Sequence, residues 1–337
     1  GQGWEQGIVY GGDSACADNQ LLRLQNTDAR QLIDNNAFYT AELGDPIAPH
    51  LLVGDIEVPV FLAGAWQDEQ TGGHFPAMLD DFESAPHLYA TMVNGSHTES
   101  IASLAIFERY VEFLELYVAL QTPDLTRASL VGPILVGGLT GTAGLELPTG
   151  NRFRGMDYDT ALEAYEAQEP VRILFEEGAA DGQPPGSPLH RFEVSFPAWP
   201  PAGMATSWYL NGDGTLTATP ATAEVSASSY VSDPANLPPV TFDGSQSAVW
   251  AADASYDWQP IPEGTGLGWV SEPMQASTVA IGSGSVDLWV RSSAADTDLE
   301  VTISEVRPDG QEVYVQSGWL RASHRALDEA ASTETSI

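Results

Sequence analysis

Two short and largely apolar runs, Val58–Gly64 and His87–Val93, constrain the fold of this chain more than any other feature. A strand that is covered on both faces needs such a run, because both rows of its side chains meet apolar neighbours. Between the runs, Phe75–Phe82 predicts a helix, which would supply the crossover that parallel strands require. The three segments predict a β-α-β unit in which Val58–Gly64 is a central parallel strand.

A long amphipathic helix is predicted after the second run. Between Ser100 and Leu120 apolar residues recur at a spacing of about 3.6 residues, and Thr122–Pro123 ends the pattern. Another helix is predicted over residues 18–40, before loop signals at 44–49. Beyond residue 123 helical spacing is scarce except near Thr160–Ala167, so we expect the fold class to change there.

The second half of the chain predicts short antiparallel strands. Trp208–Leu210 and Leu216–Thr219 flank Asn211–Gly214, which is a hairpin signal. Alternation of apolar and polar residues is clearest in three further segments, Ser285–Arg291, Leu299–Val306 and Glu312–Val315. Such a series is typical of a sandwich or jelly roll, and we expect Trp289 and Trp319 in its core.

The charge of the chain is strongly one-sided. It has 47 Asp and Glu against 12 cationic residues, all of them arginine, for a net charge of −35. A polyanion repels phosphate backbones and anionic headgroups, so neither nucleic acid nor a membrane surface is an expected partner. An extracellular or salt-adapted setting suits this surface, although genome composition explains the bias equally well, and the location stays open.

Few features bear on processing or export. Cys16 is the one cysteine, which excludes a disulfide within the chain. No stretch approaches the roughly 18 apolar residues of a membrane helix. Residues 1–20 lack the basic start and apolar run of a signal peptide.

Asp68 and His97 are the candidate catalytic residues, because each follows one of the two apolar runs. The carboxyl ends of neighbouring parallel strands meet at one edge of a sheet, where such folds bind ligands. A carboxylate there can fix the tautomer of an imidazole and stabilise the imidazolium of acyl transfer. Glu69 is an alternative acid. The acid precedes the histidine in the chain, as in α/β-hydrolases.

The other histidines have no partners at the spacing of metal ligands, so we predict no catalytic metal and no cofactor. They are His50, His74, His87, His190 and His324. Trp66, two residues before the acid, could line a substrate pocket or pack beneath the acid loop, and we favour packing. Asp213 lies in a hairpin turn, without the full pattern of a calcium loop.

An ordered set of segments carries a resemblance to a known family. The segments are Val58–Val60, Gly64–Asp68, Asn94–His97, Phe196–Pro200, Trp208–Leu216, Val290–Leu299, Asp309–Gly310 and Gly318–Arg321. This set resembles the α/β-hydrolases that include cocaine esterase, X-Pro dipeptidyl-peptidases and α-amino-acid ester hydrolases, over most of the chain from about Gly44.

The resemblance implies an α/β plus all-β chain in four parts. Residues 1–50 would be a partial cap region, and 51–125 the C-terminal part of an α/β-hydrolase domain. Residues 126–170 would be a linker or helical connection. Residues 171–337 would be a jelly-roll-like β domain, expected to be incomplete at its C-terminus.

The chain departs from the family because it contains no Gly-x-Ser-x-Gly turn. The resemblance places the nucleophilic serine upstream, together with the first half of the hydrolase sheet and an oxyanion-hole tyrosine, so we expect this chain to be a piece without that half. The internal candidates are poor, because they lack a preceding strand, belong to the β region or adjoin the histidine. They are Ser14, Cys16, Ser96, Ser245, Ser247, Ser283 and Ser285.

The expected function is therefore a serine hydrolase for an ester, amide or peptide bond, with Asp68 and His97 supplied here and the serine elsewhere. Alone, the chain should be inactive. Its expected partners are a small acyl substrate, the missing hydrolase half in the same or a separate chain, and a possible second copy. The alternative is a non-catalytic binding protein, a degenerate hydrolase scaffold whose jelly roll binds a ligand. Esterase, dipeptidyl-peptidase and acylase activity all remain open.

Overall fold

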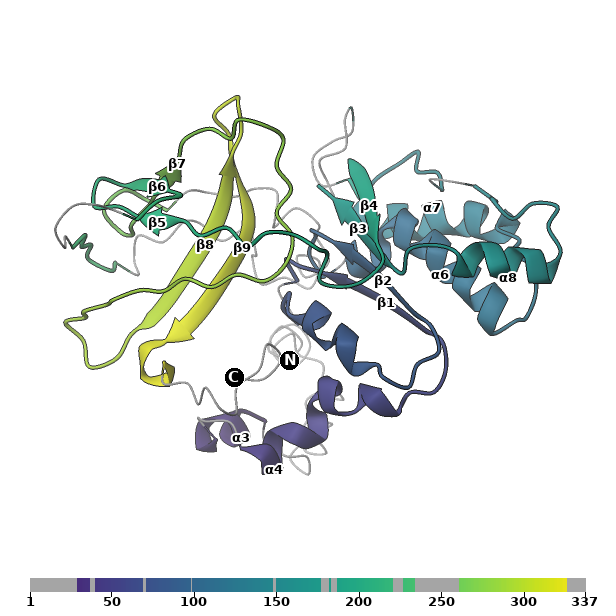
Figure 1. Ribbon diagram of the computed structural model, residues 1–337, viewed down its shortest axis with the longest axis horizontal. Helices are drawn as coiled ribbons and strands as arrows, with labels where there is room; N and C mark the ends of the chain where they lie inside the picture. Colours follow the sequence, from purple (N-terminus) through teal and green to yellow (C-terminus); the bar gives the residue numbers. More distant parts are fainter. Residues whose placement is uncertain are drawn as a thin grey trace, which may run out of the picture.

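The computed structural model describes residues 29–36, 40–68, 71–97, 99–147, 150–176, 182, 187–220, 227–233 and 261–325. Figure 1 shows a sheet with helices gathered at one side and a long β-hairpin at the other. Short helical segments lead into the sheet. They are α3 (Ala29–Asn35), α4 (Ala41–Gly44) and the 3-10 helices η2 (Asp45–Ile47), η3 (Pro49–Leu51) and η4 (Val53–Asp55). Residues 18–28 of the predicted first helix lie outside the described residues.

A mixed sheet carries the first part of the chain. Its order is β1 (Val60–Ala65), β2 (Leu88–Val93), β3 (Val171–Phe175) and β4 (Phe192–Phe196). The pairs β1–β2 and β2–β3 are parallel, and β3–β4 is antiparallel. The predicted parallel pairing of the two apolar runs is confirmed.

Two details of that unit differ from the prediction. The crossover is the 3-10 helix η5 (Phe75–Asp81), which has Pro76 in its first turn. Strand β1 lies at the edge of the described sheet and is only partly buried up to Ala63, whereas β2 is buried almost throughout. Among the described strands, β2 rather than β1 therefore has the two covered faces that the apolar run predicted.

The helices after β2 also depart from the prediction. The single helix expected over Ser100–Leu120 is divided into α5 (Glu99–Ala102) and α6 (Leu104–Tyr117), because Ser103 is extended with φ −82° and ψ 127°. The left-handed φ of 53° at Leu120 keeps the helix from continuing. Helix α8 (Tyr158–Glu166) forms where predicted and is capped by Asp157, which accepts from the Thr160 amide at 2.9 Å.

Helix α7 (Thr126–Thr140) lies in the region expected to be a linker or helical connection, where helical spacing is scarce. Pro133 and three glycines interrupt its sequence and hide the helical spacing. One of these, Gly132, is needed for packing, because a Cβ there would lie 2.7 Å from the Phe107 ring of α6. The outer side of α7 exposes Leu130 and Ile134. No described helix has the length and apolar character to cross a membrane.

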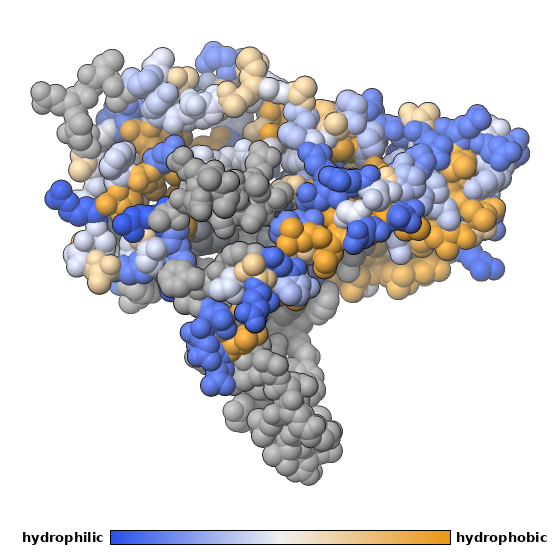
Figure 2. All heavy atoms as spheres, turned by 60° about the horizontal axis from the view of Figure 1, so that its bottom comes forward, coloured by the Kyte–Doolittle hydropathy of each residue, from blue (hydrophilic) through white to orange (hydrophobic). Residues whose placement is uncertain are grey.

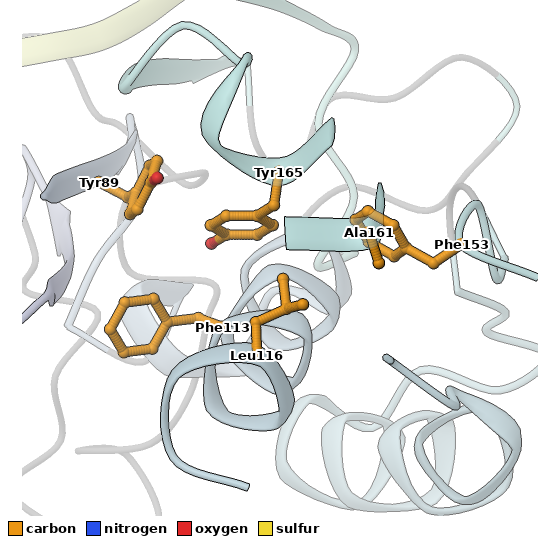
Figure 3. Close-up of a cluster of buried hydrophobic side chains, with 6 residues drawn as sticks. All are labelled: Tyr89, Phe113, Leu116, Phe153, Ala161 and Tyr165. Carbon is orange, nitrogen blue, oxygen red and sulfur yellow. The ribbon is translucent and has the colours of Figure 1, made fainter. Parts of the chain in front are cut away.

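A buried aromatic cluster joins β2 to the helices (Figure 3). Its members are Tyr89, Phe113, Leu116, Phe153, Ala161 and Tyr165. The rings of Tyr89 and Tyr165 meet edge to face, with their centroids 4.8 Å apart. Burial raises the pKa of Tyr165. This cluster fixes α6 and α8 against the sheet.

The sheet extends past the expected domain boundary at residue 171. Strand β3 pairs with β2, and Arg172 of β3 binds Glu193 of β4. The region expected to be a linker or helical connection, 126–170, contains α7 and α8. Both helices lie on the same side of the molecule as β1–β4, away from the β8–β9 hairpin (Figure 1). Residues up to Phe196 therefore contribute to this sheet, because β3 pairs with β2 in parallel and β4 pairs with β3.

The remaining strands form two smaller sheets. One contains β5 (Tyr209–Leu210), β6 (Thr215–Thr217) and β7 (Val270–Ser271), and the other is the hairpin of β8 (Asp298–Val306) and β9 (Glu312–Arg321). A 3-10 turn, η8 (Ala322–His324), follows. The predicted hairpin around Asn211–Gly214 and the strands at 299–306 and 312–315 are confirmed.

Three expectations for this region are wrong. Ser285–Arg291 forms no strand, and its alternating residues have no sheet to pack on among the described residues. Trp289 is fully exposed at 105%, and Trp319 is 68% exposed. Alternation predicted that one face of each segment would be covered, but no described element covers these two rings.

Candidate active site

Backbone hydrogen bonds continue past the ends of β1 and β2 and bring the two following loops together. The Trp66 amide donates to the Val93 carbonyl at 2.9 Å, and the Gln67 amide donates to the Gly95 carbonyl at 3.0 Å. The parallel register that pairs Ala65 with Val93 sets up these contacts. The residues that follow each strand therefore lie side by side.

Asp68 and His97 meet at this edge. Nδ1 of His97 lies 2.8 Å from Oδ2 of Asp68, and the side chains are 28% and 6% exposed, respectively. An imidazole that donates from Nδ1 to a carboxylate carries its lone pair on Nε2. The nearly buried carboxylate can orient this ring, while the partly exposed imidazole remains accessible for proton transfer.

Thr71 holds the carboxylate from its other side, and the sequence analysis missed it. Its amide donates to Oδ1 of Asp68 at 2.8 Å, and its hydroxyl donates to Oδ2 at 2.7 Å. Asp side chains often accept from backbone amides a few residues further on, and this tendency could have pointed to a local partner for Asp68. Glu69, the alternative acid, lies outside the described residues.

The loop that carries His97 is fixed by a buried acid. Glu99 is fully buried, and its Oε2 accepts from the amide of Ser96 at 2.6 Å and from its hydroxyl. Gly95 is required here, because a Cβ would lie 2.7 Å from Cβ of Glu99. The Ser100 hydroxyl donates to the His97 carbonyl at 2.7 Å. These bonds set the position of the histidine backbone.

A cavity of about 210 Å³ lies against the two residues. It is lined by Leu62, Ala63, Gly64, Ala65, Asp68, Thr71, Phe75, His97 and Ser100. One of these lining residues, Ser100, is a serine, but its hydroxyl donates a hydrogen bond to the His97 carbonyl. Ser283 and Ser285 do not line the cavity, and Ser14, Ser245 and Ser247 lie outside the described residues.

Trp66 does not line the cavity. It packs with the apolar cluster around Leu79 and Met92, and its ring centroid lies 6.1 Å from that of Trp199. Two other histidines lie near acids instead, His87 near Glu166 and His190 near Glu193. Within the described ranges, no group of side chains has the composition of a metal site.

Comparison with known proteins identifies one matching family and two similar proteins. Residues 164–334 match the family described as the X-Pro dipeptidyl-peptidase C-terminal non-catalytic domain. Proteins named "Putative serine esterase" from Mycobacterium bovis and Mycobacterium tuberculosis are each 26% identical over 164 residues, which is 45% of this chain. The match covers 25% of each relative's length. No solved structure matches significantly.

Proposed function

We propose that this chain, which belongs to the X-Pro dipeptidyl-peptidase C-terminal domain family, is part of a serine hydrolase that cleaves an ester or amide bond through an acyl-enzyme. The observation that carries the proposal is the 2.8 Å contact between His97 Nδ1 and the nearly buried Asp68, beside a cavity at the strand ends. The names of the two mycobacterial relatives support the same reaction class.

The proposed roles follow from this contact. His97 is the general base, whose Nε2 takes the proton of a serine hydroxyl as that oxygen attacks the substrate carbonyl. His97 then returns the proton to the leaving alcohol or amine, and water repeats the sequence to release the acyl group. Asp68 orients the ring and stabilises the imidazolium. The serine is proposed to lie outside these 337 residues, with backbone amides that hold the oxyanion.

The proposed architecture is the C-terminal part of an α/β-hydrolase sheet, including β1–β4, followed by a jelly-roll-like β domain. Residues up to about 50 would belong to a cap. We place the boundary between sheet and β domain after Phe196, since β3 pairs with β2 and β4 pairs with β3. The partner of β1 would be the upstream half of the sheet, in the same chain or a separate one. No cofactor is needed for this chemistry.

Labelling of the full-length protein with a fluorophosphonate, followed by peptide mapping, tests the proposal. We expect the probe on a serine outside these 337 residues, and loss of labelling in His97→Ala. Asp68→Asn should lower the labelling rate by roughly 10⁴-fold, the size seen when a triad acid is replaced. His87→Ala is the matched control, because His87 directly precedes β2, at the end of the strand opposite to the loop that carries His97.

A non-catalytic binding role is the competing function. The family description "non-catalytic domain" and the missing Gly-x-Ser-x-Gly turn are the observations in its favour. Wild-type protein that takes up no probe would support the binding role and contradict the hydrolase. A label that persists in His97→Ala would contradict the roles given to Asp68 and His97.

A further inference from the structure

We infer that strand β9 of the β domain positions the candidate catalytic acid. The acid loop is defined here by its described residues, 66–68 and 71–73. Figure 1 shows β9 beside the sheet that carries this loop, and three side-chain hydrogen bonds join them. The inference rests on the proposed function, and it gives a positioning role to a domain whose family is described as non-catalytic.

Gln67 connects the histidine loop to β9. The backbone amide of Gln67 donates to the carbonyl of Gly95 at 3.0 Å, and Gly95 lies two residues before His97. The side-chain Nε2 of Gln67 donates to the carbonyls of Val315 at 2.9 Å and Tyr314 at 3.3 Å. The residue directly before Asp68 is therefore held from both sides.

A β-bulge makes the Val315 carbonyl available. In the register of the hairpin, Ile303 pairs with Gln316 and Ser304 with Tyr314, which leaves Val315 as the extra residue. Such a residue lacks a place in the ladder, and bulges often redirect groups next to active sites. Here the bulge turns this part of β9 toward Gln67.

Gln316 completes the contact from the opposite direction. Its Oε1 accepts from the Ser317 amide at 2.9 Å and from the Tyr314 hydroxyl at 3.2 Å. Since both donors lie within β9, the Nε2 of Gln316 faces the acid loop and donates to the Trp66 carbonyl. These two contacts within β9 therefore fix the orientation of the Gln316 side-chain amide.

Gly73 allows this approach. A Cβ at that position would overlap the Trp66 carbonyl oxygen and lie 2.9 Å from Nε2 of Gln316. The loop therefore folds back so that its two ends enclose the Gln316 amide. Asp68 lies within this closed loop, and Thr71 fixes its carboxylate from there. A displacement of the loop would change the contact between Asp68 and His97, where an error of about 1 Å can cost a hundredfold in rate.

The test uses Gln316→Met in the full-length protein, with hydrolysis of p-nitrophenyl butyrate as the readout. Met keeps the length of the side chain but removes the donor. We expect kcat to fall roughly tenfold to a hundredfold while KM stays within about twofold, because positioning of the acid acts on the chemical step. Gly73→Ala should have the same effect from the loop side. Gln311→Met, at the exposed turn of the same hairpin, is the control and should match wild type.

Hydrogen exchange gives a second readout that does not need activity. Amides of residues 66–68 and 71–73 should exchange faster in Gln316→Met than in wild type and in Gln311→Met. Wild-type kcat in Gln316→Met, or a raised KM with unchanged kcat, would overturn the inference. If wild-type protein neither labels nor hydrolyses, the proposed function fails, and the exchange rates alone then decide whether β9 holds the loop.

Discussion

At the scale of single residues, the candidate site depends on how one carboxylate is shared. Oδ2 of Asp68 accepts from both His97 and Thr71, while Oδ1 accepts from the Thr71 amide. Thr71 therefore fixes the rotation of the carboxylate. Its backbone amide holds Oδ1 whatever the side chain is, whereas the bond to Oδ2 requires the hydroxyl. A residue with no chemical role of its own can thus control the histidine through the acid.

Replacing Thr71 by Val should lower kcat roughly tenfold to a hundredfold, because a hydrogen bond to a charged group is worth roughly 1.5–3 kcal/mol. The rate of ester hydrolysis measures the effect, and Thr71→Ser should keep most of the activity because it retains the hydroxyl. Thr215→Val is a matched control, since Thr215 donates its amide and hydroxyl to Asp213 in a comparable turn. Equal kcat in Thr71→Val and wild type would show that the hydroxyl has no positioning role.

At the scale of elements, a buried ionic group ties α6 to the segment before α8. Glu112 is fully buried, and both of its oxygens accept from Arg152, at 2.9 and 2.7 Å. Arg109 lies 3.6 Å from the same carboxylate, and burial together with the charge of Arg152 lowers the pKa of Arg109. The guanidinium of Arg152 also lies over the Phe153 ring at 4.4 Å. The packing of α6 therefore depends on this charge being paired.

The variant Arg152→Met should destabilise the protein by about 3 kcal/mol, because it leaves a buried carboxylate without its bidentate partner. Adding Glu112→Leu should recover most of the loss, since no buried charge then remains. Urea unfolding midpoints measure both effects. Arg321→Met, which breaks an exposed pair with Asp298, should change the midpoint little. A similar loss from Arg152→Met and Arg321→Met would contradict the role of burial.

At the scale of the whole molecule, the net charge of −35 opposes the compact state. Figure 2 shows hydrophilic residues spread over the face in view, with hydrophobic patches between them. Like charges on such a surface repel one another over a distance that salt shortens. Stability should therefore depend on ionic strength more than in a protein with balanced charge.

The melting temperature should rise between roughly 0.05 and 1 M NaCl, because the screening length falls from more than 10 Å to about 3 Å. Choline chloride at the same ionic strength should give the same rise, since screening does not depend on the identity of the cation. Differential scanning fluorimetry measures both series. A flat or falling melting temperature would contradict self-repulsion, and a rise with sodium alone would indicate a specific ion site instead.

The sequence by itself determined the local elements whose side-chain pattern is complete within a few residues. The runs that became β1 and β2, the hairpin strands β8 and β9, and the Asn211–Gly214 turn are of this kind. It also indicated that Asp68 and His97 would be neighbours, since parallel strands bring the ends of both runs to one edge.

Only the tertiary structure decided contacts between segments far apart in the chain. The pairing of β3 with β2, the packing of α7 on α6 at Gly132, and the hydrogen bonds between β9 and the acid loop join residues with no shared local pattern. The exposure of Trp289 was equally beyond the sequence. An apolar side chain favours burial, but whether it is buried depends on which other element of the fold covers it.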